Sequence, residues 1–290
     1  MYGVDARVPT PVRLLCIHGW MDNAASFAAL AEHLMPALPP TASLLALDLC
    51  GHGLSSHLPG GFYTLSQHAA LVAEALELLD WQHCTLLCHS MGGAVGMLLA
   101  GAFPERCRGL VLLDSAGPIS RPARDAPDAL RAFTAAKAQL AARPGGSTYA
   151  SLEDAVRARL QTVASYPGAQ TLSQQAAHSL VQRMLVRRPE GGGWGWAFDP
   201  LIKLHSVTGT PDEVVLEHCA RLAAASLPVL LLRASKGWPY PQQAMEARLA
   251  AMAATLQVVP GGHHAHADPD TAPGVAAAVL AWLSSKGLLA

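Results

Sequence analysis

Charged residues and cysteines are scarce in this chain of 290 residues. Only 14% of the residues are charged, and 20 basic against 21 acidic residues leave a net charge of −1. A chain without a basic excess lacks the electrostatic footprint of a nucleic-acid-binding protein or a polybasic membrane adaptor. Six cysteines are too few for a disulfide scaffold. We therefore expect reduced cysteines and no nucleic-acid partner.

Signals for secretion or membrane insertion are also missing. The first residues, MYGVDARVPTPVR, contain no apolar stretch of the signal-peptide type. The run Cys84–Phe103 carries no charge, but its His-Ser pair and its glycines suit a strand, a turn and a buried helix better than a membrane span. With 51% hydrophobic residues the chain can bury a large core. We expect a cytoplasmic globular protein without a membrane span.

Short apolar runs alternate with helical patterns along most of the chain. Runs that are apolar on both faces are typical of strands in a parallel sheet covered on both sides. Strands that alternate with helices predict a doubly wound α/β sheet. The expected strands are Leu14–Ile17, Leu44–Leu49, Thr85–Cys88, Leu110–Leu113, Val229–Leu232 and Leu256–Val259. The expected helices are Ala24–Leu34, Ser66–Leu79, Gly92–Ala102, Gln242–Ala253 and Pro273–Ser284.

The alternation stops within residues 118–227, where the periodicity is helical and no strand is indicated. The sheet pattern resumes directly afterwards without linker composition, which favours a lid over the carboxyl edge of the sheet rather than a separate module. The core then comprises residues 1–117 and 228–290. Helices of the lid are expected to begin at Ser151, near Leu172–Arg187, and at Thr210 as an N-cap followed by proline.

The segment Thr85–Gly96 has the pattern of a nucleophile elbow. An apolar strand leads into Cys88-His-Ser90-Met-Gly92, and a helix of small residues follows. In such a turn the serine stands at a helix N-terminus, which favours negative charge. The positions two before and two after the serine must be small, and Cys88 stands where glycine is usual. We predict that Ser90 is a nucleophile; the alternative is an ordinary turn with a serine N-cap.

Three further segments extend this pattern: His18–Phe27, Asp48–His57 and Pro260–His266. With them the sequence resembles the α/β-hydrolase superfamily and, within it, the serine hydrolase-like proteins. The resemblance covers both halves of the core and only loosely the lid. It implies an α/β-hydrolase fold, with a mostly parallel doubly wound sheet and a helical lid inserted after the sixth strand of the family, which corresponds here to Leu110–Leu113. It also implies a serine hydrolase that needs no cofactor.

The same geometry implies an oxyanion hole formed by two backbone N–H groups. One belongs to Met91, directly after the predicted nucleophile, and the other to Trp20 in the loop after the first expected strand. We interpret His18 in that loop as a packing residue rather than a proton carrier. Asp48 and His52 are likewise interpreted as scaffolding for the loop that contains them.

The general base is expected after the last strand, because the triad order on this fold is serine, acid, histidine. His263 lies there in a Gly-Gly turn and matches the family position, while His264 and His266 compete with it. The alternative is a metal site of these three histidines. Since no further ligand is evident beyond Asp268, we expect no metal.

The position of the acid departs from the commonest arrangement of the family. The loop that usually supplies it has Gly237 at the expected position, and no Asp or Glu occurs between Glu217 and Glu246. The next candidate is Asp114, at the end of the strand after the one that leads to Ser90. We predict Asp114 as the triad acid. If it is only structural, the chain is a binding protein that has kept the fold and lost catalysis.

Aromatic residues on loops and in the lid predict an apolar substrate pocket, suited to a small uncharged ester. No nucleotide-binding glycine loop is present. Lactone or carbon–carbon bond hydrolysis uses the same triad and remains an alternative reaction. Two of the tryptophans, at 194 and 196, are equally suited to anchoring the lid. The expected pocket residues are Trp20, Trp194, Trp196, Trp238 and Tyr240.

Overall fold

A computed structural model describes residues 11–142, 146–168, 170–188, 192–204 and 209–289. It contains a six-stranded sheet in the order β2-β1-β3-β4-β8-β9, in which all neighbouring strands are parallel. This agrees with the predicted doubly wound α/β sheet. The strands are β1 (Arg13–Ile17), β2 (Ser43–Leu47), β3 (Cys84–His89), β4 (Cys107–Leu113), β8 (Val229–Lys236) and β9 (Thr255–Gly262).

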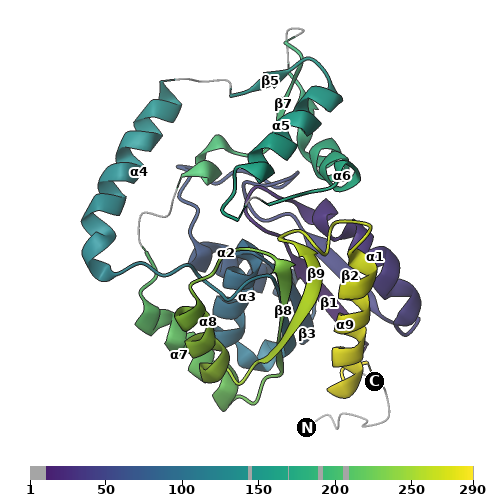
Figure 1. Cartoon of the computed structure of the whole chain (residues 1–290). Helices are drawn as coiled ribbons and strands as arrows, with labels where there is room; N and C mark the ends of the chain where they lie inside the picture. Colours follow the sequence, from purple (N-terminus) through teal and green to yellow (C-terminus); the bar gives the residue numbers. More distant parts are fainter. Residues whose placement is uncertain (1–10, 143–145, 169, 189–191, 205–208, 290) are drawn as a thin grey trace.

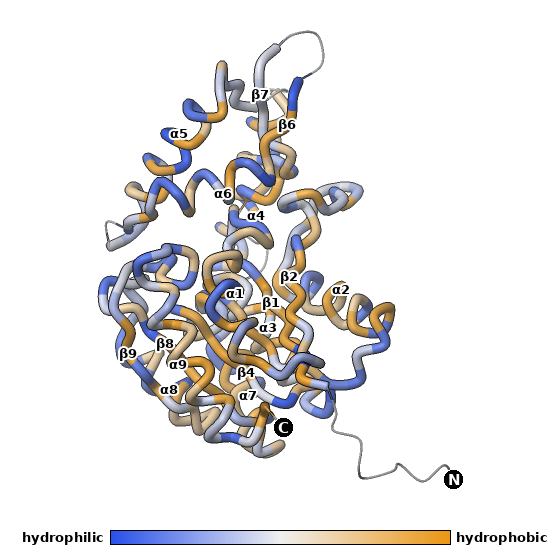
Figure 2. Tube along the Cα trace, turned by 90° about the vertical axis from the view of Figure 1, so that its right-hand side faces the viewer, coloured by the Kyte–Doolittle hydropathy of each residue, from blue (hydrophilic) through white to orange (hydrophobic). Residues whose placement is uncertain are grey.

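Helices cover both faces of this sheet (Figure 1). Successive residues of a strand point to opposite faces, and Leu14 and Leu15 of β1 accordingly belong to different buried clusters. Figure 2 shows the resulting concentration of hydrophobic residues along the central strands. On one face lie α1 (Ala28–Leu34) and α9 (Ala272–Ser285). On the other lie α2 (Leu65–Leu78), α3 (Met91–Ala102), α7 (Asp212–Ala224) and α8 (Gln242–Ala251).

An inserted segment, residues 118–211, leaves these layers after β4 and lies above one end of the core (Figure 1). It has its own cluster of buried residues and a small antiparallel sheet. The sequence indicated no strand here, because strands of two or three residues are too short for a period to register. Its elements include α4 (Ala126–Ala141), β5 (Thr148–Tyr149), α5 (Leu152–Ala164), α6 (Gln174–Met184), β6 (Leu185–Arg187) and β7 (Trp194–Trp196).

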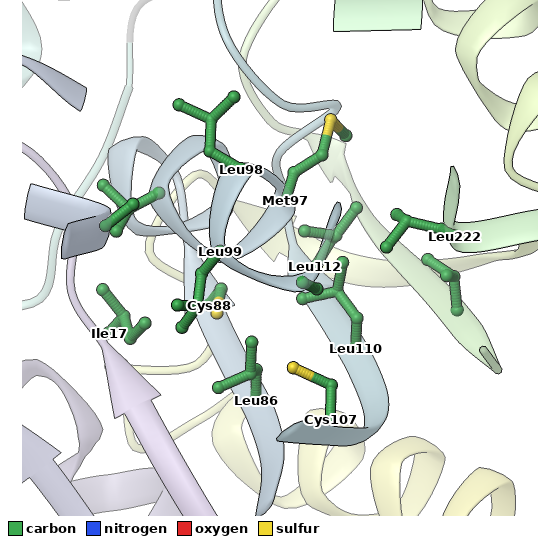
Figure 3. Packing of buried hydrophobic residues seen from close by; sticks show 14 of the residues in the cluster. Ile17, Leu86, Cys88, Met97, Leu98, Leu99, Cys107, Leu110, Leu112 and Leu222 are labelled. Atoms are coloured by element: carbon green, nitrogen blue, oxygen red, sulfur yellow. The ribbon is translucent and has the colours of Figure 1, made fainter. Parts of the chain in front are cut away.

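Helix α7 belongs to the core, although the sequence pattern assigned it to the lid. Its Cys219 and Leu222 are buried in the cluster that also contains β4 and α3. Figure 3 shows Leu222 facing Leu110 and Leu112 of β4. The packing therefore changes before α7 and not at residue 227. The N-cap of α7 is Pro211 rather than the expected threonine one residue earlier.

A buried arginine, Arg248 of α8, joins the two ends of the inserted segment. Its Nη1 donates to the carbonyl oxygen of Pro118 (2.7 Å), where the segment begins. Its Nη2 donates to the hydroxyl of Ser120 and to the carboxylate of Asp212 (3.1 Å), where the segment ends. A β-bridge between Ser120 and Thr210 pairs the same two stretches. Entry and exit of the segment are therefore adjacent.

Candidate active site

Ser90 lies in a sharp turn between β3 and α3. Its backbone angles are φ 52° and ψ −117°, a conformation that non-glycine residues rarely adopt. The turn is tied to β4, because the Ser90 N–H donates to the carbonyl of Leu113 (3.2 Å) and Ser115 Oγ donates to the carbonyl of Ser90 (2.7 Å). Helix α3 begins at Met91, so the Ser90 side chain stands at its N-terminus.

The residues around Ser90 explain why cysteine is tolerated where glycine is usual. A Cβ at Gly92 would lie 2.1 Å from the carbonyl oxygen of Ile17, so this position admits no side chain. Cys88 is fully buried, and a Cβ at Gly96 would lie 2.4 Å from its Sγ. The thiol of Cys88 therefore occupies the space left by the missing side chain of Gly96 on α3.

Ser90, His263 and Asp114 form a continuous hydrogen-bonded chain. Nε2 of His263 lies 2.8 Å from Oγ of Ser90, and Nδ1 of His263 lies 2.6 Å from Oδ2 of Asp114. The three residues follow the carboxyl ends of β3, β9 and β4. Carboxyl ends of parallel strands meet at one edge of a sheet, which is how residues so distant in sequence come together.

The Asp114 carboxylate is held by the backbone of the loop after β8. Its Oδ1 accepts from the N–H of Ala234 (3.0 Å), and its Oδ2 accepts from the N–H of Trp238 (2.7 Å). A Cβ at Gly237 would lie 2.1 Å from Oδ1 of Asp114. The loop thus has glycine at the usual position of the acid, and the carboxylate of Asp114 occupies the adjoining space.

Burial lowers the pKa of His263 below its usual value of 6.5, and the hydrogen bond to Asp114 opposes this effect. The ring is therefore neutral at neutral pH. Its Nδ1–H donates to the carboxylate, which leaves Nε2 free to accept from the hydroxyl of Ser90. A neutral imidazole in this orientation can act as a general base.

The two N–H groups predicted for an oxyanion hole belong to residues that border the same cavity as Ser90. Met91 is the first residue of α3, and Trp20 lies in the turn after β1. Within the described part of the chain, neither N–H has a hydrogen-bond acceptor. Both groups are therefore available to a bound oxygen atom.

His18 and Asp48 have the packing roles expected for them. Nδ1 of His18 donates to the carbonyl of Gly19 (2.8 Å), and its Nε2 accepts from the N–H of Leu49 (2.9 Å). Both ring nitrogens are thus engaged and unavailable for catalysis. Asp48 accepts from two backbone N–H groups and forms an ion pair with Arg183 (3.0 Å).

A cavity of about 410 Å³ opens onto Ser90. Trp20, Trp238 and Tyr240 line it, as the sequence predicted. Other lining residues come from segments that carry no recognisable motif, so sequence reasoning missed them. The apolar and aromatic ones are Tyr63, Leu65, Ile119, Tyr166, Ile202 and Leu204.

Trp194 and Trp196 do not line this cavity. They lie in β7 of the small antiparallel sheet, where the Trp196 indole N–H donates to the hydroxyl of Tyr149 (3.2 Å) and its ring stacks on Phe198. The guanidinium of Arg187 lies over the Trp194 ring. Of the two roles considered from the sequence, the structure therefore favours anchoring of the inserted segment.

Gln170, a buried residue of the inserted segment, was not anticipated. Its Oε1 accepts from the N–H of His263 (2.9 Å), and its Nε2 donates to the carbonyl of Gly237 (3.1 Å). One amide thus bridges the loop of the histidine and the loop that holds Asp114. No motif marks this glutamine, because its partners are backbone atoms far away in sequence.

A second buried polar group lies beside His263. Oδ2 of Asp22 is 3.2 Å from Nε2 of His264 and 3.4 Å from Nδ1 of His89, and Arg159 of α5 pairs with Oδ1. Burial alone would raise the pKa of the Asp22 carboxyl, but His264, His89 and Arg159 together hold it well below its usual range. Burial lowers the pKa of His264 to about 4. This histidine is therefore neutral at neutral pH.

Among the described residues, Asp22, His89 and His264 form the group whose donor atoms are close enough to hold one metal ion, all within 4.8 Å. The set of three histidines considered from the sequence is not formed. His263 is engaged with Asp114, and the ring of His266 packs at a tilt against that of His89, with 4.1 Å between the ring centroids.

Comparison with known proteins identifies the family. The model of the alpha/beta hydrolase fold family matches residues 12–270. The chain belongs to the α/β-hydrolase family. A serine hydrolase-like protein of Danio rerio is 30% identical to this chain over 234 residues, which are 77% of the chain and 65% of the relative. The serine hydrolase-like protein of Homo sapiens is 42% identical over 103 residues, or 35% of the chain and 49% of the relative.

The chain therefore spans only part of these two relatives, 65% of the first and 49% of the second. A solved structure of a hypothetical protein from Pseudomonas aeruginosa PAO1 is 34% identical, covers 96% of this chain with 93% of its own, and has a TM-score of 0.82. The thioesterase domain from the curacin biosynthetic pathway has a TM-score of 0.72 at 23% identity, which supports the fold alone. Within the described part of this chain, no helix is both long and apolar enough to cross a bilayer.

Proposed function

We propose that this chain is a serine hydrolase that cleaves a carboxylic ester or a similar acyl bond and needs no cofactor. The proposal depends on one observation above all, the hydrogen-bonded chain from Ser90 through His263 to Asp114. Similarity to serine hydrolase-like proteins supports it. Six unpaired cysteines support a reducing, cytoplasmic setting.

In the first half of the reaction, Oγ of Ser90 attacks the acyl carbon and its proton passes to Nε2 of His263. The carbonyl oxygen becomes an oxyanion, which the N–H groups of Met91 and Trp20 stabilise. The bond from the acyl carbon to the leaving oxygen then breaks. His263 returns the proton to the leaving alcohol, and an acyl-enzyme on Ser90 remains.

In the second half, a water molecule takes the place of the alcohol. His263 accepts a proton from the water, which attacks the acyl carbon. The new tetrahedral intermediate collapses, the bond to Oγ of Ser90 breaks, and His263 protonates the serine. Asp114 keeps Nδ1 of the histidine protonated and stabilises the imidazolium in both halves.

The substrate class is inferred from the cavity. Its lining is mainly apolar and aromatic, which supports a small uncharged acyl substrate rather than a phosphate or a sugar. The inserted segment supplies Tyr166, Ile202 and Leu204 to this lining, and we propose that it acts as the lid that selects the acyl group. A lactone or a cleavable carbon–carbon bond fits the same triad and is the alternative substrate.

A non-catalytic binding protein is the competing function, and it was suggested by the missing acid after β8. The contact between Asp114 and His263 weakens that argument, because the histidine has a carboxylate partner from β4.

Labelling with a fluorophosphonate probe tests the proposal without knowledge of the substrate. We expect rapid labelling of the native chain and none of Ser90→Ala. Ser179→Ala, at a half-buried serine of α6, is the matched control and should label normally. Hydrolysis of para-nitrophenyl esters of increasing length then defines the acyl preference. Absence of labelling and of turnover in the folded native chain would favour the binding protein.

A further inference from the structure

The cluster of Asp22, His89 and His264 lies beside the triad and takes no part in the proposed reaction. All three residues are almost fully buried, and all three border the same cavity as Ser90. One possible ligand atom of each residue lies within 4.8 Å of those of the other two. Oδ2 of Asp22 lies 3.4 Å from Nδ1 of His89 and 3.2 Å from Nε2 of His264. The cluster is therefore both preformed and reachable from the cavity.

The hydrogen bond of His89 determines which of its ring nitrogens is free. Its Nε2 lies 2.9 Å from the carbonyl oxygen of His263, and a carbonyl only accepts, so Nε2 carries a proton. In the neutral ring, Nδ1 then has a lone pair. The side chain of His89 is 1% exposed. Its Nδ1 has no hydrogen-bond partner among the described residues and faces Oδ2 of Asp22 at 3.4 Å.

Two electron-pair donors that face each other in a buried site repel unless a cation lies between them. A metal ion shared by His89 and Asp22 would supply that cation. A metal-binding histidine almost always donates its other N–H to a carbonyl or carboxylate, as His89 does. Ligating carboxylates are themselves hydrogen-bonded, as Asp22 is to Arg159 through the other oxygen.

The two distances from Asp22 to the histidines also suit a metal ion. In a tetrahedral site with bonds of about 2.0–2.1 Å, neighbouring ligand atoms lie about 3.3 Å apart. Oδ2 of Asp22 lies 3.4 Å from Nδ1 of His89 and 3.2 Å from Nε2 of His264. Two nitrogens and one oxygen favour zinc-like transition metals over calcium or magnesium.

We propose that Asp22, His89 and His264 form a binding site for a divalent transition-metal ion of the zinc class. Three protein ligands leave a fourth position for water. Binding requires Nε2 of His264 to be free of its proton, which moves to Nδ1, an atom without a hydrogen-bond partner among the described residues.

The rings of His89 and His264 lie next to that of His263, with 4.7 Å and 5.3 Å between the centroids. The proposed metal site is therefore adjacent to Ser90 and His263, but metal binding there does not depend on the proposed function.

Titration of the full chain with Co²⁺, a spectroscopic substitute for Zn²⁺, tests the site directly. We expect one equivalent to bind with the visible bands of four-coordinate cobalt, without the thiolate charge-transfer band that a cysteine ligand produces. Zn²⁺ should displace it. His264→Gln and Asp22→Asn should each weaken binding at least about tenfold, whereas His33→Gln, at an exposed histidine of α1, should not.

Circular dichroism of each variant separates loss of the site from loss of the fold. Should Asp22→Asn fail to fold, His264→Gln carries the test. A native chain that binds no cobalt would overturn the proposal. Equal binding by the native chain and the folded His264→Gln variant would also overturn it.

Discussion

The carboxylate of Asp114 occupies the space that a side chain at Gly237 would need. The position where the family usually has its acid is a glycine, and a Cβ there would lie 2.1 Å from Oδ1 of Asp114. The carboxylate reaches the same point from β4 instead of from the loop after β8. A side chain at position 237 would therefore have to displace the Asp114 carboxylate.

Asp114→Asn tests the role of that carboxylate. An amide retains the shape but stabilises the wrong tautomer of His263, so turnover should fall by about 10³- to 10⁴-fold while the chain stays folded. Ester hydrolysis and the melting temperature are the measurements. Asp48→Asn is the contrasting variant: it should lower stability, because Asp48 braces a loop, and leave kcat nearly unchanged.

A relocation experiment follows from the shared position. Asp114→Ala should be almost inactive, and adding Gly237→Asp should recover at least about tenfold in kcat, because the space beside His263 is then free for the new carboxylate. Gly237→Asp alone should destabilise the chain through steric and charge conflict with Asp114. If the double variant is folded but no more active than Asp114→Ala, the two positions are not interchangeable.

The pH dependence of kcat/KM reports the free His263. Only the neutral ring can accept the serine proton, so activity is lost as the pH falls through its pKa. Because burial lowers that pKa below 6.5, half-maximal activity should occur below pH 6.5 and the rate should be constant at neutral pH. A midpoint above pH 6.5 would contradict this assignment. His263→Ala should abolish the profile along with the activity.

The fit between Cys88 and Gly96 can be measured as a coupling energy. Gly96→Ala places a methyl group 2.4 Å from Sγ of Cys88, and overpacking of this kind costs about 1–3 kcal/mol. With Cys88→Gly in the same chain, the added methyl group has room and most of that loss should disappear. Urea unfolding of the single and double variants gives the coupling. Additive effects would show that the two residues do not share the space.

Trp196 and Trp238 should respond differently to truncation. Trp196→Ala removes packing on Phe198 and should lower the melting temperature with little change in KM for ester substrates. Trp238→Ala enlarges the cavity and should change KM and acyl preference more than stability. Opposite behaviour of the two variants would restore the pocket role first considered for Trp196.

Local patterns were enough to predict most of the core. The strands are apolar on both faces, and the elbow at Ser90 is defined by small residues within a few positions of it. Asp114 could be proposed as the acid because no acidic residue occurs around Gly237, and the structure places its carboxylate 2.6 Å from the His263 ring. In each case the information lies in neighbouring residues or in the order of strands.

Other features depend on packing between distant segments. Helix α7 is amphipathic wherever it docks, so its pattern could not show that it lies on α3 rather than in the lid. Gln170 bonds to backbone atoms, which leave no trace in composition. Asp22 and His264 lie in loops and His89 ends β3, and only the fold reveals that these three distant residues come together.

The hydrogen bonds of Arg248 to both ends of the inserted segment mean that the segment could be exchanged as a unit. Its two ends meet at Pro118, Ser120 and Asp212, so a short linker between them would close the core without reordering the sheet. The inserted segment could thus be replaced while Ser90, His263 and Asp114 keep their places at the edge of the sheet. Any replacement must still supply a hydrogen-bond acceptor for the backbone N–H of His263, which now donates to Oε1 of Gln170.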